Sequence, residues 1–236
     1  MDDRSWAAHR ASNMVFADRH EAGIELASRL RTYRGRPDLV VLALPRGGVP
    51  VAFEIAEALD APLDIFVVRK LGMPGHSEFA MGAIASGGVR VLNADIIRSY
   101  RIPESAVEAV AQWELAELER REREYRQGRP LTELRDRTVI LVDDGLATGS
   151  TMRAAVQAVR LHGPARVVVA VPVGAPATCQ ELAAVADEAV CARTPEPFSA
   201  VGQWYRDFSQ TTDEEVQALL EKHAQHARGG DADHKP

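Results

Sequence analysis

One short run of residues constrains the fold of this chain more than any other. Residues 139–142 read Val-Ile-Leu-Val, and two acids, Asp143 and Asp144, follow directly. Four consecutive β-forming residues without polar alternation are typical of a strand buried on both faces, as in a parallel sheet. A loop of small and hydroxyl residues spans 145–151, and residues 152–156 have helical character. The run therefore predicts a strand–loop–helix unit of an α/β domain.

The loop after this strand has the chemistry of a phosphate site. The first N–H groups of a helix lack an intrahelical partner and carry partial positive charge, so they bind anions. Thr148, Ser150 and Thr151 add hydroxyl donors, and Gly149 lets the backbone approach a ligand closely. The preceding aspartates are acceptors for adjacent ribose hydroxyls and for the water shell of Mg²⁺. The segment therefore predicts a site for a sugar phosphate.

The same residues are compatible with two alternatives. A Walker B strand also ends in acids, but it requires a G-x-x-x-x-G-K-[ST] loop elsewhere, and the sequence has none. In a purely structural role, Ser150 or Thr151 would be a helix N-cap. Capping accounts for one hydroxyl and leaves the acid pair unexplained, so the sequence favours a ligand site.

At residues 139–151 the chain resembles the type I phosphoribosyltransferases, whose fingerprint is four hydrophobic residues, two acids, a short spacer and T-G-x-[ST]. The core motif is most similar to that of the adenine enzymes. The resemblance implies an α/β fold with an open, twisted, mainly parallel sheet flanked by helices, a flexible loop and a small hood. It implies that Asp143 and Asp144 hold the ribose of phosphoribosyl pyrophosphate (PRPP) and bind Mg²⁺ through water. The implied phosphate cradle consists of Ala147, Thr148, Gly149, Ser150 and Thr151.

Two more strand ends fit this site, because ligands of open parallel sheets bind where the strands end. A strand at 39–44 precedes Pro45, Arg46, Gly47 and Gly48. By itself a Gly-Gly turn is only a turn, but in this place it resembles the family's pyrophosphate loop. The Pro45–Arg46 bond matches the position where that loop often has a non-proline cis peptide.

A second strand at 63–68 is followed by Arg69 and Lys70 and then by a glycine-rich stretch at 71–88. Two cations beside a diphosphate neutralise its charge, which would make them catalytic. The glycine-rich stretch resembles the family's flexible catalytic loop, which closes over the donor. The alternative is an ordinary hairpin excursion with a solvated Arg-Lys pair.

Residues 193–212 are rich in proline and aromatic residues and are expected to form the hood. Phe198, Trp204 and Tyr205 could sandwich a planar acceptor, although aromatic residues more often belong to a core. In 6-oxopurine enzymes of the family an aspartate that meets the base stands where this chain has Ala147. We therefore expect an acceptor other than hypoxanthine or guanine.

The remaining pattern predicts the organisation of the chain. Pro103 opens a long helix in which Trp113 packs inward or against a second subunit, so a homodimer is one possible state. The expected segments are a polar leader at 1–13, a core at 14–192 with a helical insertion at 103–127, the hood at 193–212, and a helix and polar tail at 213–236. Periodicity predicts helices at 16–33, 49–59 and 213–226 and further strands at 166–171 and 188–192.

Composition excludes some classes of partner. The net charge is −6, from 28 basic and 34 acidic residues, which disfavours binding to nucleic acid. The sequence lacks an apolar run of membrane-spanning length and a signal-peptide core, so we expect a cytoplasmic protein that does not bind membranes. In that compartment Cys179 and Cys191 are expected to be unpaired apolar filler. These features together predict a Mg²⁺-dependent phosphoribosyltransferase acting on PRPP and a small-molecule acceptor. The alternative is a PRPP-binding regulator without transferase activity.

Overall fold

The computed structural model describes residues 15–230 and has a five-stranded parallel sheet at its centre. The strand order is β2-β1-β6-β7-β8, and each neighbouring pair is parallel. The strands are β1 (Leu39–Ala43), β2 (Leu63–Ile65), β6 (Thr138–Val142), β7 (Arg166–Val173) and β8 (Glu188–Arg193). The expected α/β fold with an open, mainly parallel sheet is therefore confirmed.

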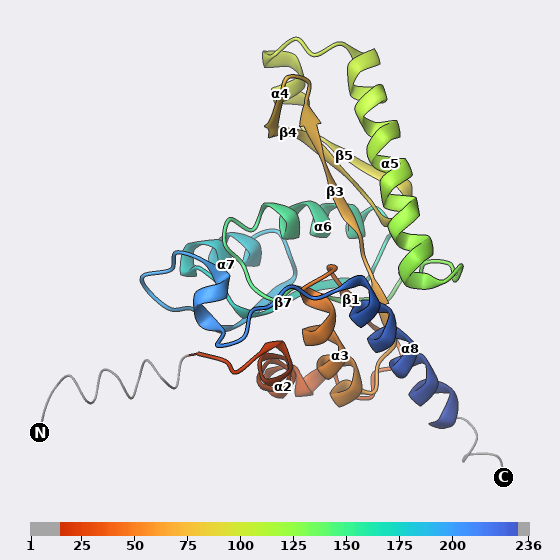
Figure 1. Cartoon of the computed structure of the whole chain (residues 1–236), viewed down its shortest axis with the longest axis vertical. Coiled ribbons are helices and arrows are strands. Elements are labelled where there is room, and N and C mark those ends of the chain that lie inside the picture. Colours follow the sequence, from red (N-terminus) through yellow and green to blue (C-terminus); the bar gives the residue numbers. More distant parts are fainter. Residues whose placement is uncertain (1–14, 231–236) are drawn as a thin grey trace, which may run out of the picture.

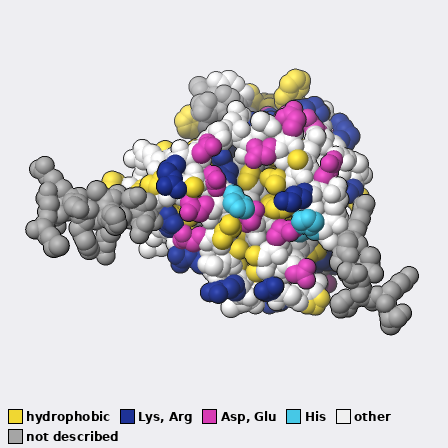
Figure 2. Space-filling view, turned by 60° about the horizontal axis from the view of Figure 1, so that its bottom comes forward, with side chains coloured by type: hydrophobic (Ala, Val, Ile, Leu, Met, Phe, Trp, Pro, Cys, Tyr) yellow, Lys and Arg dark blue, Asp and Glu magenta, His cyan; other side chains and the backbone are white. Residues whose placement is uncertain are grey.

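Helices cover both faces of the sheet (Figure 1). One face carries α2 (Arg19–Arg29), α3 (Gly48–Leu59) and α8 (Asp213–Gly230), and the other carries α6 (Ser150–Arg160) and α7 (Pro176–Ala183). Acidic and basic side chains are mixed with apolar ones where α2, α3 and α8 lie (Figure 2), without a continuous basic area among the described residues of that face. None of the helices within residues 15–230 is long and apolar enough to cross a bilayer.

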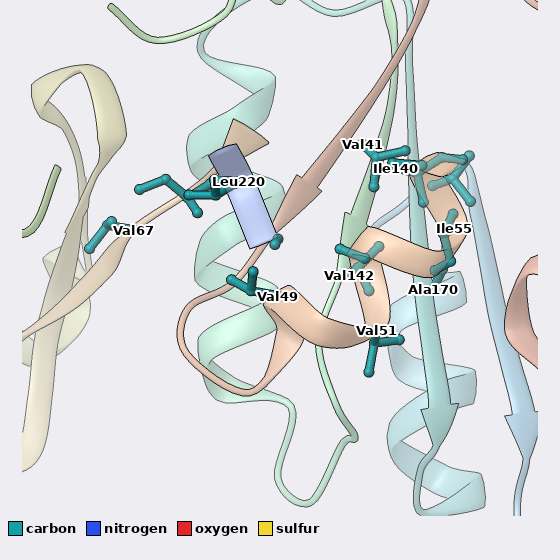
Figure 3. Close-up of a cluster of buried hydrophobic side chains, with 14 of the residues drawn as sticks. Val41, Val49, Val51, Ile55, Val67, Ile140, Val142, Ala170 and Leu220 are labelled. Carbon is teal, nitrogen blue, oxygen red and sulfur yellow. The ribbon is translucent and has the colours of Figure 1, made fainter. Parts of the chain in front are cut away.

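The core follows from the alternation of side chains along the buried strands. Val41 and Ile140 point to the α3 side, where they pack near Ile55 (Figure 3). Their neighbours Leu42 and Leu141 point to the α6 side. Because both faces are covered, every residue of β1 and β6 is buried, which explains the continuous apolar runs in the sequence.

Residues 68–126 form a projecting unit that we call the arm (Figure 1). It contains an antiparallel sheet of β3 (Val68–Met73), β4 (His76–Ala85) and β5 (Val89–Leu92), then α4 (Ala94–Ser99) and α5 (Glu104–Arg126). One expectation is wrong here: the second parallel strand ends at Ile65, so Arg69 and Lys70 lie inside β3. Most of the stretch 71–88 is β-structure and forms a hairpin, which was the alternative for this stretch. Pro74 and Gly75 form a tight turn, with Gly75 at φ +76°, and this turn lets the two strands pair.

The arm is anchored to the sheet by a buried ion pair at its base. The Arg126 guanidinium donates to Asp64 Oδ1 at 2.8 Å and to the Ile65 carbonyl at 2.6 Å. Asp64 Oδ2 accepts from the N–H and hydroxyl of Thr132, both at 2.9 Å. Further out on α5, Trp113 is 76% exposed, so the expectation that it packs inward is wrong, and its contact with a second subunit stays a prediction.

The hood includes residues near Phe16, which were expected to belong to the core. Phe16 donates its N–H to the Trp204 carbonyl, and its own carbonyl accepts from the Arg206 N–H, both at 2.8 Å. A short 3₁₀ helix, η3 (Val201–Trp204), precedes this pairing. The hood of the folded chain thus combines residues near 16 with residues 198–209. The predicted leader at 1–13 and the final residues of the predicted tail lie outside the described residues.

The expectation of two unpaired cysteines is also wrong. Cys179 of α7 and Cys191 of β8 form a disulfide, with a Cα–Cα distance of 6.6 Å. The packing of α7 on the sheet brings these two residues within disulfide reach, although they are 12 positions apart.

Candidate active site

The two loops predicted to bind the donor lie side by side at the carboxyl edge of the sheet. The register pairs Ala43 of β1 with Val142 of β6, so the residues that follow each strand meet. A Cβ at Gly47 would lie 2.0 Å from Asp144 Oδ2, and a Cβ at Gly48 would lie 2.7 Å from the Val142 carbonyl oxygen. Only glycine fits at this approach, because the loop after β1 packs directly on the acid pair.

The loop after β1 adopts the backbone form expected from the family resemblance. The peptide bond between Pro45 and Arg46 is cis. The Arg46 guanidinium lies 3.7 Å from Asp213 Oδ2, at the start of α8, and the Tyr125 hydroxyl donates to the other oxygen of that carboxylate. The Arg46 side chain is therefore tied to α8, and the glycine backbone is the part of this loop that faces the acids.

Both acids of the pair have raised pKa values. Burial, followed by the neighbouring Asp144 carboxylate, raises the pKa of Asp143 well above its ordinary value. Burial also raises the pKa of Asp144, although the Arg19 guanidinium acts in the opposite direction. Asp143 Oδ1 accepts a hydrogen bond from the Asp144 N–H at 2.9 Å. Such a pair is suited to hydroxyl donors and to a cation.

The residues predicted to bind the 5-phosphate lead into the start of α6. Gly149 is the N-cap, at φ +67°, and no side chain caps the helix, so the alternative in which Ser150 or Thr151 is an N-cap is wrong. The Thr148 and Ser150 hydroxyls lie 3.3 Å apart. The loop is also bonded to α7, since the Thr178 hydroxyl donates to the Ala147 carbonyl at 2.8 Å. The free helix start and the paired hydroxyls form a cradle for an anion.

The two cations of the arm lie on opposite faces of β3, because side chains alternate along a strand. Arg69 pairs with Glu114 of α5, with the closest contact at 2.6 Å. Lys70 instead lines a cavity of about 420 Å³ between the arm and α6, together with Ser150 and Thr151. The structure brings Lys70 to the cradle and directs Arg69 away from it.

The three hood aromatics are placed differently from one another. The rings of Phe198 and Trp204 are stacked, with centroids 6.3 Å apart. Tyr205 is buried, and its hydroxyl donates to the Asp144 carbonyl at 2.6 Å, so it is not free to sandwich an acceptor. Burial, followed by the Asp144 carboxylate, raises the pKa of the Tyr205 hydroxyl. The hood also reaches the fingerprint loop at Gly145, where a Cβ would lie 2.4 Å from Val201.

One residue at the site was missed in the sequence. Arg19, the first residue of α2, forms an ion pair with Asp144 at 2.8 Å. It lies 125 positions from its partner in a segment without a motif, so no local pattern could have revealed it.

The donor set at the acid pair fits Mg²⁺. Within the described residues no group of three or more His, Cys, Asp or Glu side chains could hold a metal by itself. Mg²⁺ dehydrates reluctantly and is usually bound by one or two carboxylates together with substrate phosphates and water. Asp143 and Asp144 match that requirement.

Comparison with known proteins agrees with this geometry. A family model described as "Phosphoribosyl transferase domain" matches residues 17–195, and the chain therefore belongs to this family. The Mycobacterium tuberculosis H37Rv protein named "Putative phosphoribosyl transferase Rv0571c" is 50% identical over 220 residues, which cover 93% of this chain and 49% of that protein. Its counterpart in strain CDC 1551 matches to the same extent. The chain thus spans about half the length of these relatives.

A solved structure has the same fold over nearly its whole length. The crystal structure of TT1426 from Thermus thermophilus is 45% identical, with a TM-score of 0.79, and the match covers 89% of this chain and 99% of that one. The family and fold expected from the fingerprint are therefore confirmed. The particular similarity to adenine phosphoribosyltransferases stays a prediction.

Proposed function

We propose that this protein is a Mg²⁺-dependent phosphoribosyltransferase that moves ribose 5-phosphate from PRPP to a nitrogen nucleophile and releases pyrophosphate. The observation that carries the proposal is the direct contact of the Gly47–Gly48 loop with Asp144, beside the cradle at the start of α6. These three elements correspond to the diphosphate, the ribose hydroxyls and the 5-phosphate of one donor. Membership of the phosphoribosyl transferase domain family supports the same assignment.

The reaction requires charge stabilisation more than a strong base, because C1 of the ribose becomes oxocarbenium-like as pyrophosphate leaves. Asp143 and Asp144 would hold the ribose hydroxyls, and residues 147–151 would hold the 5-phosphate. Asp143 and Asp144 would hold Mg²⁺ through water, and the metal would supply charge neutralisation for the leaving group. Lys70 would add a second cation from the arm, and closure of the arm would exclude water that otherwise hydrolyses the donor. The loop that contains Arg46 would bind the diphosphate through its backbone, because the Arg46 side chain is paired with Asp213. Arg69 has no part in the proposed site, because its side chain is paired with Glu114.

The acceptor is proposed to be a small molecule other than a 6-oxopurine. The Ala147 methyl group has no polar atom to offer a ring nitrogen, and the Ala147 carbonyl already accepts from Thr178. Phe198 and Trp204 remain the aromatic surface for a planar acceptor, with stacking worth about 0.5–1.5 kcal/mol beyond area burial. We propose that the protein acts in the cytoplasm on small molecules and not on nucleic acid or membranes.

Calorimetric titration with PRPP tests the donor site. The wild-type chain should bind PRPP with Mg²⁺ present and lose at least about tenfold in affinity in EDTA, since donor and metal bind as one chelate. The double variant Asp143→Asn, Asp144→Asn should lose a similar factor or more while keeping its thermal stability. Glu119→Gln, at an exposed acid on α5, is the matched control and should bind normally. Equal affinity with and without Mg²⁺ would refute the metal requirement.

A pyrophosphate-release screen over purines, pyrimidines, aryl amines and amino sugars tests the transfer. Release with one acceptor class, and not with hypoxanthine or guanine, is the expected result. Binding of PRPP without release for any acceptor would favour the regulator without transferase activity. Comparable synthesis of inosine or guanosine monophosphate would refute the assignment of Ala147.

A further inference from the structure

Arg19 contacts Asp144, the second acid of the pair. Its Nε lies 2.9 Å and its Nη2 2.8 Å from Asp144 Oδ2. The third nitrogen, Nη1, donates to the carbonyl oxygen of Ser209 in the hood at 2.7 Å. The side chains of Arg19 and Asp144 are 11% and 16% exposed, so the pair is largely removed from water.

The surroundings of the guanidinium connect three parts of the site. On one side it lies over the Phe208 ring of the hood, 4.1 Å from the ring centroid. On another side a Cβ at Gly47 would lie 3.3 Å from Arg19 Nε, so the diphosphate loop passes directly beside it. The Tyr205 ring also lies near the guanidinium, 6.0 Å from Arg19 Cζ to the ring centroid, and its hydroxyl donates to the Asp144 carbonyl. Arg19 therefore contacts the second acid, the loop after β1 and the hood at once.

Both contacts of Arg19 with the carboxylate fall on Oδ2, which leaves Oδ1 for a ligand. An arginine fork has a rigid planar geometry, so binding through two of its nitrogens fixes the rotation of the acid. A carboxylate held in this way does not have to reorient when a hydroxyl group binds. A preorganised acceptor binds more tightly than a mobile one, because less conformational freedom is lost on binding.

We propose that Arg19 is a positioning residue of the donor site, which orients Asp144 so that its Oδ1 accepts from a ribose hydroxyl. Through its bond to Ser209 it also links the hood to that acid. This inference rests on the proposed function, because it requires Asp144 to bind the sugar. It assigns a role to the N-terminal segment, which carries no part of the fingerprint.

Variants of Arg19 test the role through donor binding with Mg²⁺. Arg19→Gln should weaken PRPP binding by at least about tenfold, and Arg19→Lys, which keeps one charged donor, should recover part of the loss. Arg29→Gln is the matched control, because Arg29 lies on the same helix in an exposed ion pair with Glu25 at 3.6 Å. It should bind PRPP as the wild type does. Thermal unfolding of each variant shows whether it is folded.

A second measurement separates positioning from a general loss of structure. Wild-type protein should bind ribose 5-phosphate more tightly than 2,3-dideoxyribose 5-phosphate, since only the former has hydroxyls for the acid pair. Arg19→Gln should reduce this preference and leave the affinity for the dideoxy sugar unchanged, because the cradle at α6 is intact. An equal loss for both sugars would assign Arg19 a structural role only.

Three further results would overturn the inference in distinct ways. PRPP binding by Arg19→Gln at wild-type strength would show that Asp144 needs no orientation. Tighter binding would show that Arg19 competes with the donor for the carboxylate. Absence of PRPP binding by the wild-type chain, in contrast, would refute the proposed function and with it the basis of this inference.

Discussion

The central sheet and the arm differ in how completely they bury their large side chains. Every residue of β1 and β6 is buried, and these strands are made of Leu, Val, Ile, Ala and one Thr. In the arm, Ala and Gly recur along β4, and large apolar side chains lie outside: Trp113 is 76% and Tyr100 58% exposed. The sheet therefore buries its large side chains, while the arm presents some of its own to solvent.

This difference assigns different tasks to the two regions. The acid pair and the glycine loop follow fully buried strands, so their geometry is fixed by a close-packed core. The arm joins the sheet through the Arg126–Asp64 pair at its base and carries Lys70 at the cavity beside α6. Regions with fewer buried apolar contacts open at lower free-energy cost. We therefore expect the donor's ribose and diphosphate to be held by the rigid part, while the movable part brings the Lys70 cation to them.

Truncation in the sheet should have the largest effect. Ile140→Ala removes a fully buried side chain between β6 and α3 and should lower the free energy of unfolding by about 2–5 kcal/mol. Leu92→Ala, at a half-exposed position of the arm, should cost less than about 1 kcal/mol. Urea denaturation of both variants measures the comparison. Similar losses would mean that the arm is as tightly packed as the sheet.

The two faces of β3 should differ in their effect on donor binding. Lys70→Ala should weaken PRPP affinity by about tenfold, because it removes a cation beside the cradle. Arg69→Ala should change that affinity by less than about twofold and should instead loosen the contact with α5, where Glu114 loses its partner. Titration with PRPP and hydrogen exchange of residues 104–126 distinguish the two. The reverse order of affinities would place Arg69 at the site.

The smallest effect on unfolding is expected at Trp113. Trp113→Ser should change the free energy of unfolding of the single chain by no more than about 0.5 kcal/mol, because the side chain has few intramolecular contacts to lose. Light scattering after size exclusion should show a smaller dimer fraction for this variant, as expected for a homodimer that buries this helix. A dimer of unchanged stability would place the contact elsewhere.

Local sequence was sufficient for the sheet strands and for the start of α6. Strands 39–44 and 139–142 agree with β1 and β6 to within one residue, because strands buried on both faces are recognisable as uninterrupted apolar runs. The cradle at 147–151 was predicted for a related reason, since a helix start and its hydroxyl loop are contiguous in the chain. The cis bond between Pro45 and Arg46 came from the family resemblance.

The arm shows where local pattern was misleading. One strand was expected over 63–68, yet β2 ends at Ile65 and β3 begins at Val68, and β4, paired with β3 and β5, runs through most of the glycine-rich stretch 71–88. Glycine lowers strand propensity, but pairing on both sides stabilises a strand that propensity alone does not favour. Once β3 is a strand, alternation sends Arg69 and Lys70 to opposite faces, which their adjacency in the sequence could not show.

The sequence by itself determined the class of fold and the strand, acid pair and loop of the fingerprint, because each is encoded in consecutive residues. Only the tertiary structure decided the partners of these residues. Arg19 reaches Asp144 across 125 positions, Phe16 joins the hood at Tyr205, and Cys179 meets Cys191 through the packing of α7 on the sheet. Such contacts depend on where separate elements dock on a shared core, and neither the period nor the composition of one segment contains that information.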